Sequence, residues 1–136
     1  MRHKHLEDFE RIEKPWGYEV LFAKSSGSNG YIGKLLYIDS GERLSMQYHE
    51  KKEETIFIKS GTLYLQTFGD IRDNISHLDL TSIQICEIEL VSGEIYHIPP
   101  FFSHRFIAKE TDVEIIEIST NHLKDTIRIS DDYGRV

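Results

Sequence analysis

The sequence predicts an all-β protein, either a sandwich or a barrel, and three observations lead to this fold class. Short segments rich in Val, Ile, Leu, Tyr and Phe recur along the chain, and these residue types favour strands. Gly, Ser, Asn and Asp separate the segments, so turn signals return about every ten residues. Hydrophobic residues make up 39% and charged residues 29% of the chain, a balance typical of a globular rather than a disordered protein.

Each apolar segment is a predicted strand that ends in a turn or loop. The predicted strands comprise residues 17–23, 31–39, 43–49, 54–60, 62–68, 83–90, 93–99, 104–108 and 112–120. The sequence around Gly61 predicts a hairpin turn, in which glycine relieves a positive φ. Residues 69–82 are polar and predict an extended surface loop, where His77 is exposed rather than ligating. Pro99 and Pro100 predict a rigid, extended loop.

The chain starts with a charged segment, residues 1–13, which we interpret as an exposed arm or a short helix. It contains His3 and His5, and histidines so near a terminus are more often solvated than metal-bound. A proline and a glycine on either side of Trp16 predict a turn with a buried indole. Residues 14–136 then form a single predicted domain, large enough for a sizeable core.

Net charge and cysteine count restrict the classes of partner and compartment. The chain has 16 basic and 23 acidic residues, a net charge of -7 and no basic block, which argues against a nucleic-acid partner. Its apolar runs are too short to cross a bilayer, and its start lacks the apolar stretch of a signal peptide. The single cysteine, Cys86, cannot form an internal disulfide. We therefore expect a cytoplasmic protein in which Cys86 is a small strand residue.

One stretch carries the residue types of a metal site. Gln47 and His49 lie two residues apart, so both side chains leave the same face of a strand. The charged residues 50–53 can form a turn that starts a new antiparallel strand and returns Glu54 to the same pocket. A further histidine, His104, lies far downstream. Imidazole, carboxylate and amide oxygen are ligands of divalent first-row metals, so these residues predict a metal site.

The spacing of these residues resembles the two conserved motifs of the cupin family. The first motif is matched by Gly41, Gln47, His49, Glu54 and Gly61, and the second by Gly93, Pro99 and His104. A glutamine stands where the first motif usually has its first histidine. More narrowly, the segments LSMQYH, KPWGYE, HRF and IRISDDYGR are similar to the mannose-6-phosphate isomerase branch of the cupins. That branch includes the C-terminal domain of bifunctional isomerase/guanylyltransferases.

The resemblance implies a fold, a metal and a reaction. The fold is the double-stranded β-helix, or jelly-roll barrel, and the tail of residues 120–136 packs back on it although its sequence has weak helical character. One divalent ion, Zn, Mn, Fe, Co or Ni, is held by Gln47, His49, Glu54 and His104. His97 is left as a residue that supports the site or contacts substrate. The implied reaction converts an aldose to a ketose through an enediol, with a base that moves a proton between neighbouring carbons.

A catalytic base is sought among the carboxylates of the last predicted strand. Alternation in residues 112–120 places Glu117 on the same face as Val113 and Ile115. A carboxylate in an otherwise apolar interior is a candidate proton shuttle. The alternative is that Glu117 lies near the strand end and meets a lysine or water.

Basic residues are the candidates for holding the phosphate of a sugar phosphate. Arg105 is the first candidate, since arginine is preferred for its bidentate geometry, and Lys52 ranks after it. A regular strand points Arg105 away from His104, so it acts through a bend or only structurally. Further basic candidates are Lys14, Lys34, Arg128 and Arg135.

One departure from the isomerase branch leaves the substrate open. That branch typically has a histidine- and arginine-rich run after the first ligands, then Glu and Trp, whereas residues 50–56 read EKKEETI. Three alternative functions therefore remain. They are a metal-dependent sugar-phosphate isomerase or relative, an iron-dependent dioxygenase of the cupin fold, and a non-catalytic sugar-binding cupin. We also expect a homodimer, because small β barrels expose edge strands that partners cover.

Overall fold

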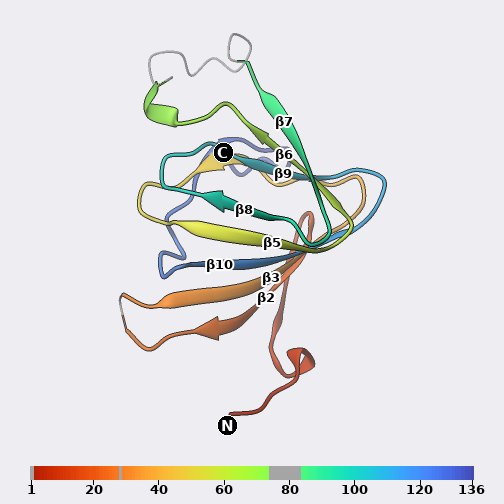
Figure 1. Cartoon of the computed structure of the whole chain (residues 1–136), viewed down its shortest axis with the longest axis vertical. Coiled ribbons are helices and arrows are strands. Elements are labelled where there is room, and N and C mark those ends of the chain that lie inside the picture. The colour runs from red at the N-terminus through yellow and green to blue at the C-terminus, as the bar shows by residue number, and fades with distance from the viewer. Residues whose placement is uncertain (1, 28, 74–83) are drawn as a thin grey trace.

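The computed structural model describes residues 2–27, 29–73 and 84–136, which consist almost entirely of strands and their connections (Figure 1). Its elements in chain order are η1 (Leu6–Asp8), β1 (Arg11–Lys14), β2 (Gly17–Lys24), β3 (Tyr31–Ile38), β4 (Met46–Tyr48), β5 (Glu54–Ser60), β6 (Thr62–Thr67), η2 (Ile71–Asp73), β7 (Cys86–Val91), β8 (Ile95–Ile98), β9 (Arg105–Ala108), β10 (Val113–Thr120) and β11 (Ile127–Ser130). Within this part of the chain, no helix is long and apolar enough to span a membrane.

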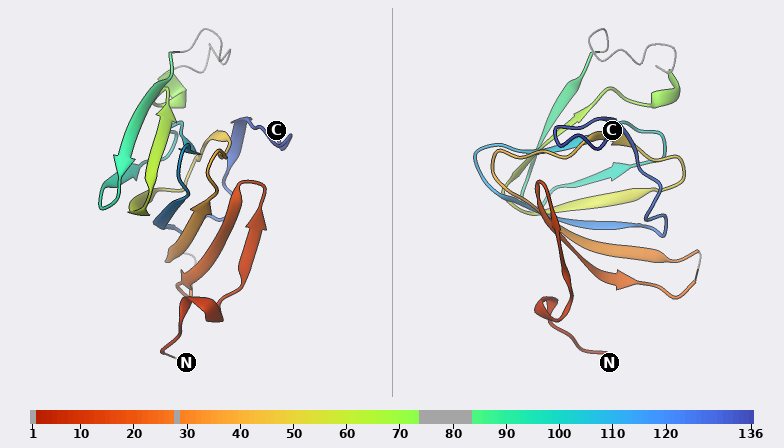
Figure 2. Two further views of the ribbon diagram at one scale, coloured as in Figure 1. Left: turned by 90° about the vertical axis from the view of Figure 1, so that its right-hand side faces the viewer. Right: turned by 180° about the vertical axis from the view of Figure 1, so that it is seen from behind.

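The strands form two layers of antiparallel sheet. One sheet has the strand order β1-β2-β3-β10-β5-β8, and the other has the order β7-β6-β9. The pair β11-β4 continues the second layer, because the bridges Arg43↔Ile107 and Gln47↔His104 join residues 43–47 to β9. Figure 2 shows β6 and β7 in green on one side of the molecule and β2 and β3 in red and orange on the other. The predicted all-β, jelly-roll architecture is therefore confirmed.

The hydrophobic core lies between the two layers. Side chains at alternate positions of a strand point to the same face of the sheet, and those of the inner faces are buried. They include Ile56, Ile58, Leu63, Leu65, Phe106, Val113 and Ile115, each at most 2% exposed. The same alternation turns Glu54 of β5 and Glu117 of β10 inward, at 2% and 4% exposure. Both carboxylates therefore lie on the inner face of the six-stranded sheet.

Two segments differ from the prediction. The tail of residues 120–136 packs back on the domain as the resemblance implies, but in place of the weak helical character of its sequence it contains strand β11, which pairs with β4. Residues 11–13, predicted as part of an arm, belong to β1 and pair with β2. Both segments form strands because each has a strand to pair with, β2 for residues 11–14 and β4 for residues 127–130. Strand formation depends more on such neighbours than on local propensity.

Three local predictions are confirmed. Trp16 lies in the turn between β1 and β2 and is 4% exposed. Gly61 joins β5 to β6 with a φ of 78°, a conformation that glycine adopts without strain. Cys86 is the first residue of β7. The predicted loop at 69–82 contains η2, whereas its residues 74–82, including His77, lie outside the described residues.

Candidate metal site

Three predicted ligands converge on one point between the sheets. One ligand atom from each of His49, Glu54 and His104 lies within 4.8 Å of the other two, and all three residues are buried. His49 Nε2 is 3.5 Å from Glu54 Oε2. His49 Nε2 and His104 Nε2 are buried without a hydrogen-bond partner, whereas Glu54 Oε2 also lies 3.0 Å from the Lys52 ammonium. Buried polar atoms normally have such partners, so two unpartnered imidazole nitrogens beside a carboxylate fit a bound cation.

Contacts with the backbone fix the orientation of His49. His49 directly follows β4, and its Nδ1 lies 2.7 Å from the carbonyl oxygen of Asp125. The amide of Phe101 donates to the His49 carbonyl oxygen at 2.6 Å, and Phe101 adopts a φ of 67° that is uncommon outside glycine. A carbonyl can only accept, so Nδ1 carries the proton and Nε2 keeps a free lone pair. This tautomer is the one that ligates a metal through Nε2.

His104 is held in the same way on a neighbouring segment of the same layer. It precedes β9, and its backbone exchanges two hydrogen bonds with Gln47 at 3.0 and 2.9 Å. Its Nδ1 lies 2.9 Å from the carbonyl oxygen of Phe102, which again leaves Nε2 as the free acceptor. Gln47 lines the same cavity as His49 and Glu54, and its Oε1 accepts from the Ser45 hydroxyl at 3.0 Å.

The electrostatics of the site keep both rings neutral. Burial and the neighbouring His104 lower the pKa of His49 to about 4, although Glu54 acts in the opposite direction. Burial likewise lowers the pKa of His104 to about 4. Metal ligation requires neutral imidazole, so both rings are ready to ligate at neutral pH.

Lys52 bridges the candidate metal site and the predicted base. Its Nζ is 3.0 Å from Glu54 Oε2 and 3.1 Å from Glu117 Oε2. Burial alone would lower the pKa of Lys52, but the two carboxylates outweigh it and the pKa is raised. The ammonium is therefore protonated at neutral pH. Glu117 Oε2 also accepts from the Ser119 hydroxyl at 3.3 Å, so the base candidate is held on two sides.

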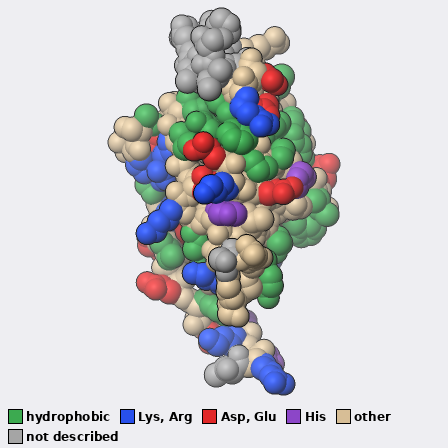
Figure 3. All heavy atoms as spheres, turned by 90° about the vertical axis from the view of Figure 1, so that its left-hand side faces the viewer, with side chains coloured by type: hydrophobic (Ala, Val, Ile, Leu, Met, Phe, Trp, Pro, Cys, Tyr) green, Lys and Arg blue, Asp and Glu red, His purple; other side chains and the backbone are tan. Residues whose placement is uncertain are grey.

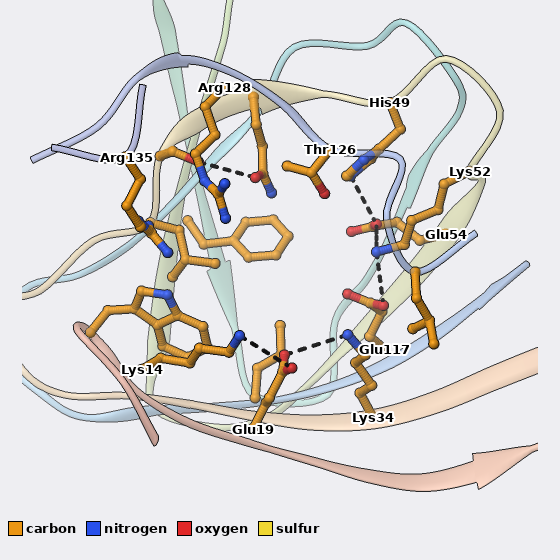
Figure 4. A pocket seen from close by; sticks show the side chains of 17 residues that line it. Lys14, Glu19, Lys34, His49, Lys52, Glu54, Glu117, Thr126, Arg128 and Arg135 are labelled. Carbon is orange, nitrogen blue, oxygen red and sulfur yellow. Dashed lines mark hydrogen bonds and ion pairs between the residues drawn. The ribbon is translucent and has the colours of Figure 1, made fainter. Parts of the chain in front are cut away.

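His49, Lys52, Glu54 and Glu117 line a cavity with an empty volume of about 700 Å³, open solvent at its mouth included. In Figure 4, His49, Lys52 and Glu54 lie at one end, and Arg128 and Arg135 lie at the other. The basic lining residues are Lys14, Lys34, Lys52, Arg128 and Arg135, and the acidic ones are Glu19, Glu54 and Glu117. Figure 3 shows both signs of charge interspersed on one outer face, whereas basic residues outnumber acidic ones inside this cavity.

Arg128 differs from the other basic residues of the cavity. Lys14 and Lys34 both pair with Glu19, at 3.6 and 3.4 Å, and Arg135 makes a bidentate contact with Asp131. Within the described part of the chain, Arg128 has no ion pair, and its Nε is buried without a hydrogen-bond partner. Its charge is therefore available to an anionic ligand.

Comparison with solved structures identifies the fold. No protein-family model and no curated protein matches the sequence. CapF of Staphylococcus aureus, a capsular polysaccharide assembling protein, matches with a TM-score of 0.68 and 16% identity over 90% of this chain and 34% of CapF. The polyketide cyclase RemF of Streptomyces resistomycificus matches with 0.70 and 14% over 94% of this chain and 84% of RemF. Oxalate decarboxylase of Bacillus subtilis matches with 0.67 and 16% over 90% of this chain and 30% of the enzyme.

This chain has a cupin fold. The neighbours are cupin-fold proteins with different names and activities, and identities of 14 to 16% show a common fold alone. The chain spans only 34% of CapF and 30% of oxalate decarboxylase. The cupin fold explains why ligands far apart in sequence meet, since β4, β5 and β9 of its two layers surround one cavity.

Two predicted residues lie away from this cupin cavity. Arg105 is 6% exposed, and its Nε and Nη2 donate to the carbonyl oxygens of Leu44 and Ser130 at 2.8 and 3.0 Å. It therefore joins the β4 and β11 segments instead of lining the cavity, as expected for a strand residue next to His104. His97 lies on the outer face, exposed, with its Nε2 2.9 Å from Glu53.

Sequence reasoning missed two residues that shape the cupin site. Asp125 accepts from the amides of Lys51 and Lys52 at 2.6 and 2.9 Å, while its carbonyl faces His49. Nothing in the sequence links Asp125 to a loop more than 70 positions earlier. Glu19 pairs with two lysines of the lining and lines the cavity itself, and the sequence of β2 carries no signal of this placement.

Proposed function

We propose that this protein is a metal-dependent isomerase acting on a sugar phosphate or a close relative of one. The observation that carries the proposal is the grouping of three converging ligand atoms with a second carboxylate and an ammonium in one buried cluster. His49, Glu54 and His104 supply the ligand atoms, and Lys52 and Glu117 supply the proton-transfer groups. Perturbed, buried titratable groups gathered in a pocket are typical of active sites.

The donor set suits a divalent first-row metal. Two neutral imidazoles and one carboxylate converge, and the Gln47 amide is available beside them; Zn, Mn, Fe, Co and Ni all accept such ligands. A cation held there would supply Lewis-acid polarisation of the substrate's oxygen atoms. Oxalate decarboxylase of Bacillus subtilis has Mn(II) centres, so the cupin fold is compatible with a metal in this class.

Proton transfer falls to the chain's own residues. Glu117 is buried and faces the cavity, so its carboxylate would take a proton from one substrate carbon and return it to the next. Lys52, 3.1 Å from Glu117 Oε2, would donate to the substrate oxygen that gains negative charge. Burial of both groups excludes bulk water from the transferred proton.

Arg128 is the residue that we assign to the anionic group of the substrate. It lies at the end of the cavity opposite His49 (Figure 4) and has no ion pair in the described part of the chain. Guanidinium binds phosphate through two parallel hydrogen bonds. Trp16 and Phe106 line the cavity as well, and they would cover the apolar face of a sugar ring. CapF, which shares the fold, is a capsular polysaccharide assembling protein, and this supports the proposal of a carbohydrate-related substrate.

A second candidate function follows from the same ligand set. Two histidines and one carboxylate also form the iron site of non-haem oxygenases. That reaction needs open positions on the iron for oxygen. The Lys52 ammonium lies 3.0 Å from Glu54 Oε2, one of the ligand atoms, and therefore occupies space next to the iron. The isomerase reading is preferred because it uses Lys52 and Glu117, whereas the dioxygenase reading gives them no task.

Metal reconstitution followed by activity assays tests the proposal. The stripped protein is loaded in turn with Zn²⁺, Mn²⁺, Co²⁺, Ni²⁺ or Fe²⁺ and assayed for aldose–ketose conversion of mannose 6-phosphate and related sugar phosphates. We expect turnover that a chelator abolishes. Glu117→Gln should lower kcat at least about a hundredfold. Arg128→Gln should lower kcat/KM mainly by raising KM. His97→Ala, on the outer face, serves as the control. Oxygen consumption with Fe²⁺ would favour the dioxygenase, and tight sugar binding without any turnover would contradict both enzymes.

A further inference from the structure

The Lys52 ammonium lies where it shares an atom with the candidate metal site. Its Nζ is 3.0 Å from Glu54 Oε2 and 3.1 Å from Glu117 Oε2. Glu54 Oε2 is also one of the three converging ligand atoms. The Lys52 side chain is 11% exposed, so little water screens its charge from its neighbours. Any cation that binds the three ligands therefore meets Lys52 at Glu54.

We propose that Lys52 is the internal counter-cation of this site, which compensates Glu54 and Glu117 in the metal-free protein and competes with a divalent cation for Glu54. The inference rests on the metal site proposed above and adds a residue that sets its affinity. Lys52 therefore differs from the ligands, because its charge weakens metal binding, whereas the ligands coordinate the metal.

The charges of the buried group give the direction of the effect. With neutral histidines, Glu54, Glu117 and Lys52 carry a net charge of -1. A divalent cation would bring this group to +1, so it enters against the repulsion of the ammonium. If Lys52 is replaced by a neutral residue, the group starts at -2 and ends neutral. Buried charges without a partner are strongly unfavourable, so the neutral variant gains more from the metal than the natural protein does.

The backbone around Lys52 allows the side chain alone to respond. Asp125 Oδ2 accepts from the amides of Lys51 and Lys52 at 2.6 and 2.9 Å, which fixes the loop that carries the ammonium. The lysine side chain is long and flexible, and Glu117 offers it a second carboxylate. Metal binding at Glu54 would thus leave Lys52 with Glu117, the pair to which we assign proton transfer.

Metal affinity, measured without any substrate, tests this proposal. The stripped wild-type protein and the variants Lys52→Met, Lys52→Gln and Lys52→Arg are titrated with Mn²⁺ by calorimetry. Mn²⁺ is the probe because it binds exposed imidazoles such as His3 and His5 least strongly among the candidate metals. Lys51→Gln removes an exposed charge from the adjacent position and is the matched control.

We expect Lys52→Met and Lys52→Gln to bind Mn²⁺ at least about tenfold more tightly than the wild type, because charge repulsion at short range is removed. Lys52→Arg keeps the charge, and Lys51→Gln leaves the site intact, so both should stay within about threefold of the wild type. The Gln variant keeps a hydrogen-bond donor for both carboxylates, and it carries the test if the Met variant does not fold.

The outcomes separate this inference from the proposed function. If the wild type binds Mn²⁺ and the neutral Lys52 variants bind it equally or more weakly, the counter-cation role is overturned while the metal site stands. If neither the wild type nor any variant binds Mn²⁺, the metal site is overturned and the inference with it. Binding by the neutral variants alone would support the inference in its strongest form.

Discussion

Two backbone carbonyls decide what His49 and His104 can do. The Asp125 carbonyl faces Nδ1 of His49, and the Phe102 carbonyl faces Nδ1 of His104. Both rings therefore keep their protons on Nδ1 and present Nε2 to the cavity. The sequence indicated the ring positions through motif spacing, but it could not indicate the tautomers, because the carbonyls that fix them come from loops whose conformation depends on the whole fold.

The lowered pKa values of the two rings predict a pH-dependent stability of the metal-free protein. Above pH 6.5, both folded and unfolded chains hold neutral rings, so these groups contribute no slope. Between pH 6.5 and about 4, His49 and His104 bind protons in the unfolded chain but stay neutral in the folded protein. The free energy of unfolding should therefore fall as pH falls through this window, by up to about 3 kcal/mol per unit for two groups.

Urea unfolding in the presence of a chelator measures this slope. His104→Gln removes one of the two groups and should roughly halve the slope, whereas His97→Ala on the outer face should leave it unchanged. A free energy of unfolding that is flat between pH 6.5 and 4, or that rises on acidification, would contradict the lowered pKa values.

Arg105 predicts a separation between stability and metal binding. It is buried and donates to the carbonyl oxygens of Leu44 and Ser130. Arg105→Met should lower the free energy of unfolding by about 2 to 4 kcal/mol, because one buried and one partly buried carbonyl lose their donor. Mn²⁺ affinity of the folded variant should stay within about threefold of the wild type. A stable variant with impaired metal or substrate binding would instead restore the functional role that the sequence suggested.

At the scale of elements, the C-terminal segment between β10 and β11 holds the loop that carries Lys52. Asp125 accepts from the amides of Lys51 and Lys52, and its carbonyl orients His49. The sequence predicted the strands that bear the ligands, because their alternation is local. It could not predict this clamp or strand β11, because both depend on pairing with residues far away in the chain.

Asp125→Ala tests the clamp. The variant should lose about 1 to 3 kcal/mol of unfolding free energy, since two backbone amides lose a charged acceptor. Its Mn²⁺ affinity should fall about tenfold, as is typical when a residue that orients a ligand is removed. Asp39→Ala, an exposed aspartate at the end of β3, is the matched control. Unchanged stability and affinity in Asp125→Ala would show that the loop is held by other contacts.

The hairpin between β5 and β6 offers a second test at this scale. Gly61 has a φ of 78°, and a Cβ there would lie 2.2 Å from the Asp112 carbonyl oxygen; Gly93 has a φ of 93° with open space around it. Gly93→Ala therefore incurs only the backbone penalty, about 1 to 2 kcal/mol. Gly61→Ala adds a clash with backbone and should lose at least about 3 kcal/mol in urea unfolding. Equal losses would contradict the close approach of β5–β6 to Asp112.

At the scale of the whole molecule, the packing of the two layers brings residues that are far apart in the sequence into one site. The all-β class followed from strand periodicity and turn spacing, and the cupin fold followed from glycine and proline spacing that the structural neighbours bear out. The charge of the cavity did not follow from composition: a chain with a net charge of -7 encloses a lining with more basic than acidic residues. That property arises only when β1, β3 and β11 meet around the same space.

Anomalous diffraction from crystals grown with Mn²⁺ tests the central claim most directly. The account predicts one strong peak between the layers, within about 2.4 Å of His49 Nε2, Glu54 Oε2 and His104 Nε2, and none in crystals of His49→Ala grown in the same way. A map without a peak at these atoms, or with the peak unchanged in His49→Ala, would contradict it.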